Sequence, residues 1–177
     1  MNAKDRATAH KRRFRRWQSN TRRETRVLSE LLEEKFVAVF LGSRFEWVGV
    51  NLTRPDWPVD TKEIVLERAN SDLIDYVVVN FEKHSAPRFQ IHFGRRRNTV
   101  DNEFIRSGNL VKNPHEYYHF WGKPAWLPTR FWSDNSAQRV VSTVTSMVDE
   151  IIAFIEFGEK GENISIHFWA STSLGAP

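Results

Sequence analysis

Cysteine is absent from this 177-residue chain, which excludes disulfides, thiolate nucleophiles and zinc sites built on cysteine. No apolar run approaches the roughly 20 residues that a membrane-spanning helix requires, and the N-terminus lacks the apolar segment of a secretory signal. A glycine-rich phosphate loop and a G-x-S-x-G nucleophile motif are also missing. We therefore expect a cytoplasmic protein that does not bind membranes and carries no cofactor.

Aromatic residues and an uneven distribution of charge are what the sequence does contain. Thirteen Phe, seven Trp and three Tyr are enough for one sizeable core. Residues 1–26 hold ten Lys/Arg against two acids, whereas the remaining residues hold sixteen against twenty. The high isoelectric point of the chain thus describes a basic N-terminal segment on a mildly acidic body.

The segment from Ile74 to Phe93 is the clearest structural signal. In its second half, Phe89, Ile91 and Phe93 alternate with polar residues, which is typical of a strand with one buried face. In its first half, residues 76–79 form a continuous apolar run rich in valine, as in strands covered on both faces. These patterns predict a β-hairpin with a helix packed on at least one side.

Helices are expected on either side of this hairpin in the sequence. Thr21 and Glu24 fit a capping box, and apolar residues at helical spacing follow them. Residues 133–157 carry a wide apolar stripe that ends at a glycine.

Further strands are predicted at residues 44–52, 63–68 and 164–169. In the last of them the alternation places Phe168 on the inward face. The element order predicts a single α+β domain, residues 21–177. Its sheet is mostly antiparallel with about 5–6 strands, and two main helices pack on it. Residues 1–20 are predicted to be a basic arm in front of this domain.

The arm is the first candidate site. Only Phe14 and Trp17 are large and apolar within it, so it cannot form a core of its own. Dense positive charge and aromatic rings favour phosphate neutralisation and stacking on unpaired bases. The residues predicted to bind a polyanion are Lys11, Arg12, Arg13, Phe14, Arg15, Arg16, Trp17, Arg22 and Arg23, extended by Arg95, Arg96 and Arg97.

Three alternatives for the arm remain open. One is an organelle-targeting segment, which Asp5 and the scarcity of apolar residues disfavour. The arm can also pair with acids of the body, such as Glu30, Glu33 and Glu34, or it can bind an acidic protein partner.

A polar sheet face is the second candidate site. Several polar or aromatic residues point away from the apolar sides of their strands, and they would form a groove if the strands are neighbours. These residues are Gln90, His92, Ser165, His167 and Trp169.

The segment His115-Glu116-Tyr117-Tyr118-His119 matches H-E-x-x-H, in which two His one helical turn apart bind zinc and the Glu activates water. The preceding Pro114 and the bulky aromatics argue against an extended helix here. A zinc-dependent hydrolase using His115 and His119 is therefore an alternative prediction. A metal-dependent nuclease built on Asp72, Asp75 and Glu82 lacks the required spacing.

The function predicted from the sequence is that of a non-enzymatic binding protein, whose arm contacts nucleic acid or an acidic protein. The layout also resembles that of small bacterial α+β proteins that include toxin-immunity proteins. An immunity-type inhibitor of a toxin is therefore a second alternative, which carries no predicted site.

Overall fold

The computed structural model describes residues 2–49, 59–82, 86–99, 103–112, 119–120 and 133–169. Its helices are α1 (Ala3–Asn20), α2 (Arg23–Leu31), the π-helix η1 (Leu32–Val37), α3 (Ala38–Gly42), α4 (Asp134–Ser146) and α5 (Val148–Phe157). Its strands are β1 (Glu46–Val48), β2 (Glu63–Asn70), β3 (Leu73–Phe81), β4 (Arg88–Arg97), β5 (Phe104–Leu110), β6 (His119–Phe120) and β7 (Ile164–Trp169).

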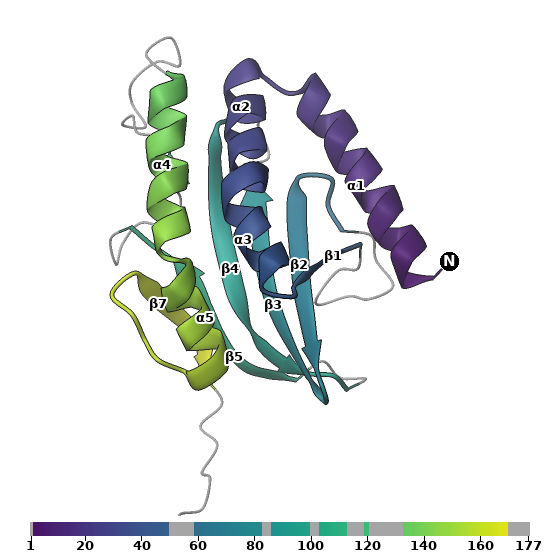
Figure 1. Cartoon of the computed structure of the whole chain (residues 1–177), viewed down its shortest axis with the longest axis vertical. Coiled ribbons are helices and arrows are strands. Elements are labelled where there is room, and N and C mark those ends of the chain that lie inside the picture. The colour runs from purple at the N-terminus through teal and green to yellow at the C-terminus, as the bar shows by residue number, and fades with distance from the viewer. Residues whose placement is uncertain are drawn as a thin grey trace, which may run out of the picture.

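The described strands form one antiparallel sheet. Their order is β1-β2-β3-β4-β5-β7, and the short β6 pairs with β4. The helices lie together on one face of this sheet, with α1 near the β1 edge (Figure 1). The predicted α+β class with an antiparallel sheet is thereby confirmed.

The main core lies between the helices and the sheet. Phe36 from η1, Ile91 from β4 and Phe154 from α5 are all completely buried in it. Burying a side chain of this size stabilises the fold by about 1.5–3 kcal/mol. Phe14 of α1 is also 0% exposed within the same core. Residues 3–20 are therefore a docked helix, which corresponds to the alternative that the basic arm packs on the body.

The β3–β4 hairpin forms as predicted. Val77 pairs with Phe93 and Val79 with Ile91, and all four side chains are completely buried on the helix side. The alternate residues of β3 are covered as well, since Tyr76 and Val78 belong to a second, smaller buried cluster.

Several helix boundaries differ from the prediction. Thr21 is the C-cap of α1, and Arg22 occupies the N-cap of α2 without a side-chain hydrogen bond, so the capping box does not form. The second predicted helix is divided at Met147, whose backbone leaves the helical region at ψ 3°. Strand β5, residues 104–110, lies in a segment for which the sequence predicted no element. None of the described helices has the length and apolar character needed to cross a bilayer.

Candidate functional site

The buried face of α1 determines which of its basic residues reach solvent. His10, Phe14 and Gln18 follow one another at a spacing of four and form its buried stripe. Phe14 packs against Trp47 of β1 at 5.4 Å and Trp17 against Phe81 of β3 at 5.2 Å between ring centroids. The prediction that Phe14 stacks on nucleic-acid bases is therefore wrong, and Trp17 is half-buried in the same contacts.

His10 fixes α1 to the rest of the domain. Trp47 Nε1 donates to His10 Nδ1 at 2.9 Å, so the other ring nitrogen carries the proton and donates to the Asp60 carbonyl at 3.1 Å. Burial lowers the pKa of His10 below its ordinary value, although the contact with the Asp60 carbonyl opposes this shift. The ring is thus held neutral in one tautomer.

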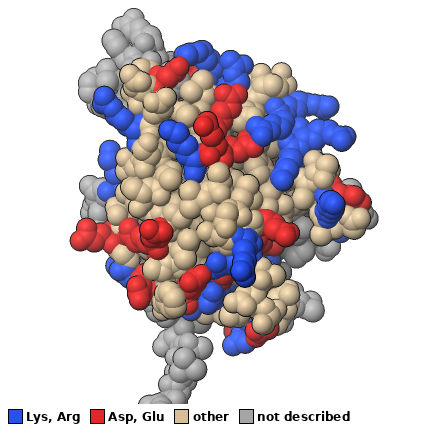
Figure 2. Space-filling view, in the orientation of Figure 1, with Lys and Arg blue, Asp and Glu red and all other residues tan. Residues whose placement is uncertain are grey.

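The opposite side of α1 is a basic surface. The helix contains seven Lys/Arg and one acid, Asp5. Arg12, Arg13 and Arg16 are exposed, and within the described ranges no acid forms an ion pair with them. Figure 2 shows Lys and Arg side chains gathered at the upper right of the molecule, where α1 lies in Figure 1.

Some of the predicted basic residues pair with acids of the domain. Arg15 pairs with Glu33 of η1. This pair agrees with the alternative prediction that the arm pairs with acids of the body. Arg23 pairs with Asp134 at 3.1 Å, with both side chains more than half exposed. Lys11 lies over the Trp47 ring at 5.5 Å. Arg22 is exposed at the start of α2. Among the described residues predicted to bind a polyanion, those without an ion pair thus lie on the outer face of α1 and at Arg22.

Arg95, Arg96 and Arg97 do not extend this surface. Arg96 pairs with Glu67 at 2.8 Å and Arg97 with Glu103 at 3.3 Å. Arg95 points to the helix side of the sheet, where its Nε donates to Asp75 at 2.6 Å. The predicted extension is therefore wrong for Arg95 and Arg96, which are largely buried and paired with carboxylates, whereas Arg97 is 46% exposed in its pair with Glu103.

Asp75 is the centre of a buried ion network. Its side chain is 0% exposed and also accepts from Arg68 Nη2 at 2.8 Å. Arg68 reaches Glu156 of α5 at 2.7 Å, and Arg95 reaches the Glu156 carbonyl at 3.3 Å. The network therefore links the ends of β2, β3 and β4 to the last turn of α5. These contacts give Asp75 a structural role.

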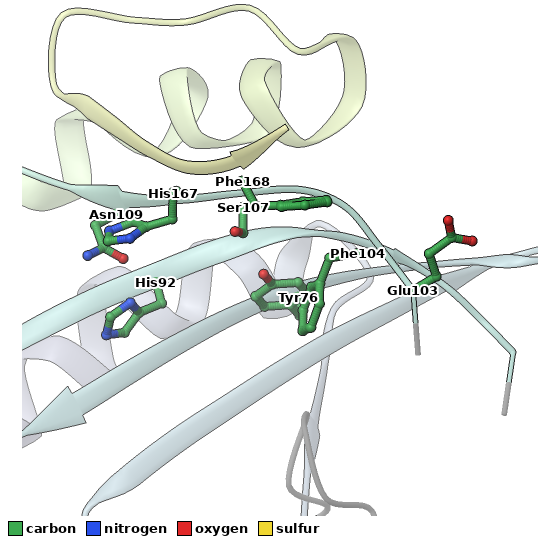
Figure 3. Close-up of a pocket in the computed structure, with 9 residues that line it drawn as sticks. Tyr76, His92, Glu103, Phe104, Ser107, Asn109, His167 and Phe168 are labelled. Atoms are coloured by element: carbon green, nitrogen blue, oxygen red, sulfur yellow. The ribbon is translucent and has the colours of Figure 1, made fainter. Parts of the chain in front are cut away.

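A separate pocket of about 360 Å³ lies on the sheet face opposite the helices. Strands β3, β4, β5 and β7 contribute its walls (Figure 3). The lining residues are Tyr76, His92, Glu103, Phe104, Ser107, Gly108, Asn109, His167 and Phe168.

Two of the residues predicted for the polar groove meet in this pocket. His92 and His167 come from β4 and β7, which β5 separates, so these strands are not direct neighbours. Gln90 contacts His92 at 3.3 Å, and Ser165 pairs with Asn109 across β5 and β7. The side chain of Trp169 lies outside the described part of the structure.

A β-bulge explains why the prediction placed Phe168 on the wrong face. Ser107 pairs with Phe168 and Gly108 with Ile166, which leaves His167 as an extra residue on β7. A bulge interrupts the alternation of side chains. His167 and Phe168 both line the pocket as a result, whereas strict alternation predicted Phe168 in the core.

Burial sets the protonation states in the pocket. It lowers the pKa of His92, an effect that the nearby Asn109 opposes and His167 reinforces. It raises the pKa of Tyr76 to about 12, although a hydrogen bond with Ser107 acts in the other direction. His92 and Tyr76 are therefore neutral at physiological pH.

The predicted zinc motif falls mostly outside the described residues, which do not include His115 or Glu116. The backbone of His119 lies in β6 rather than in a helix, so the helical spacing of the motif is not formed at that residue. Across the described ranges, no group of three or more His, Asp or Glu side chains is arranged to hold a metal ion.

No protein-family model, curated protein or solved structure matches this chain. The fold and the two candidate sites define a single-domain α+β protein with a basic helix face and a separate pocket whose described lining contains no Lys or Arg. Its function must be inferred from these features.

Proposed function

We propose that the protein binds a nucleic acid through the exposed basic face of α1. The observation that carries this proposal is the set Arg12, Arg13 and Arg16, which are exposed side by side on a docked helix and unpaired with acids among the described residues. Basic side chains that neutralise phosphates release condensed counterions, which makes such binding favourable and dependent on salt.

The burial of the aromatic residues supports recognition of the phosphate backbone. Binding to single strands relies on rings that are free to stack on bases, but Phe14 is completely buried and Trp17 half-buried. A duplex offers regularly spaced phosphates without requiring such rings. We therefore infer a duplex ligand that is bound with little sequence preference.

Fluorescence anisotropy with a labelled DNA duplex tests this proposal over a range of salt concentrations. Each neutralised phosphate contributes about −0.9 to the slope of log K against log salt. The triple variant Arg12→Ala/Arg13→Ala/Arg16→Ala should therefore make the slope shallower by about 2–3 and weaken binding at least about tenfold at low salt.

A matched control distinguishes the effect of the α1 face on binding from the effect of the net charge of the protein. Lys112, Arg139 and Lys160 are also exposed, and changing all three to Ala removes the same charge elsewhere on the surface. We expect the control to bind nearly as well as the wild type. Equal losses in both triple variants, or binding to polyglutamate and not to the duplex, would contradict the proposal. The second of these results would indicate an acidic protein partner.

A further inference from the structure

Aromatic rings form the apolar walls of the pocket on the sheet face opposite the helices. Tyr76 and Phe104 pack edge to face, with centroids 5.8 Å apart and planes at 76°. Phe168 lies over the same end of the pocket (Figure 3) and remains 46% exposed. A volume of about 360 Å³ lies within the range of small-molecule sites. The flat walls favour a ligand with a planar ring.

Among the described residues, Asn109 supplies a hydrogen-bond acceptor without a partner. Its residue is 3% exposed and its side chain lies beside His92, yet among the described residues its Oδ1 meets no donor in hydrogen-bonding geometry. A buried acceptor left in this way costs about 1–3 kcal/mol. Buried polar groups in folded proteins normally have partners. A ligand that carries an N–H donor would relieve this cost.

The described lining of the pocket favours a neutral ligand over an anionic one. No Lys or Arg side chain is among its described lining residues. Glu103 is the one carboxylate there, and it lies at the rim with its side chain 66% exposed. The remaining polar groups are hydroxyls, an amide and imidazoles, which recognise neutral edges.

We propose that this pocket binds an uncharged aromatic heterocycle that carries an amino group. The ring packs against Phe168, and the amino group donates to Asn109 Oδ1. This inference does not depend on nucleic-acid binding by α1, because the two sites lie on opposite sides of the sheet.

The proposal can be tested with two nucleosides that differ in the amino group alone. Adenosine carries the 6-amino group, and purine riboside lacks it. Titrations followed by ¹H–¹⁵N NMR should shift the amides of residues 104–109 and 164–168. The hydrogen bond from the 6-amino group to Asn109 Oδ1 should make adenosine bind about threefold to tenfold more tightly than purine riboside. Equal affinities, or no shifts at these amides with either nucleoside, would overturn the proposal.

Three variants locate the contacts. Phe168→Ala should weaken both nucleosides at least about threefold, whereas Phe157→Ala is a matched control, since Phe157 is 71% exposed on α5. Asn109→Leu removes the unpaired acceptor and leaves an apolar side chain of similar size, so it should fold. This variant should bind adenosine and purine riboside equally. Retention of the preference for adenosine in Asn109→Leu would show that Asn109 is not the acceptor.

Discussion

Removal of the Asp75 carboxylate should be among the most destabilising single changes in this domain. Its two oxygens accept four hydrogen bonds from Arg68 and Arg95, at 2.6–3.1 Å, with no exposure to solvent. Removing one partner from a buried ion pair typically costs about 3–5 kcal/mol, because the remaining charge is left without compensation. Arg68 keeps Glu156 and Arg95 keeps a backbone carbonyl, so we expect the lower end, about 3 kcal/mol, for Asp75→Ala.

Urea unfolding followed by tryptophan fluorescence measures this loss. With a slope of about 2 kcal/mol per molar urea, 3 kcal/mol lowers the midpoint by about 1.5 M. Glu103→Ala is the control, because it breaks the exposed pair with Arg97 and should lower the midpoint by less than about 0.3 M. In Asp75→Leu, the added change Arg95→Met should restore part of the stability by removing a stranded charge. A midpoint shift below about 0.5 M for Asp75→Ala, at an unchanged slope, would refute a structural role for the network.

Two further predictions concern the docking of α1. Phe14→Ala should cost about 3–5 kcal/mol in a urea titration, because it leaves a cavity in the main core, and a loss below about 1 kcal/mol would mean that α1 is not part of that core. Folding lowers the pKa of His10, so the contribution of the neutral ring to stability is complete above pH 6.5. As the pH falls below 6.5 toward the pKa of the folded state, the unfolded state binds the proton first and is stabilised. As the pH falls, the free energy of unfolding should therefore fall more steeply in the wild type than in His10→Gln, by at most about 1.4 kcal/mol per pH unit. Identical pH slopes in the two proteins would contradict this.

The hairpin and the core faces were predictable because their side chains alternate or form continuous apolar runs. Val77 and Ile91 follow the expected period and lie where it places them. The docking of α1 was not predictable, since its buried stripe has a single large apolar residue, Phe14, between the polar His10 and Gln18. Tertiary contacts satisfy these polar side chains, as in the hydrogen bond that Trp47 donates to His10. The sequence around α1 contains no pattern that predicts such contacts.

The candidate site was predictable in part for a related reason. The polar sides of β4 and β7 pointed to His92 and His167, and both line the pocket. Strand β5, which lies between them, has neither alternation nor an apolar run, so no pattern pointed to Ser107 or Asn109. Arg95 appeared to be a surface cation because an adjacent run of three arginines resembles a basic patch, whereas strand geometry directs neighbouring side chains to opposite faces.

The bulge in β7 also has a consequence for how this protein can vary between species. His167 is one residue more than the pairing with β5 requires. Loss of a single codon at this position would let the strand alternate without interruption and remove His167 from the pocket, while Phe168 would stay paired with Ser107 on the pocket face. A one-residue change in length can thus add or remove one imidazole of the pocket and leave its aromatic wall in place, independently of the basic helix on the other side of the sheet.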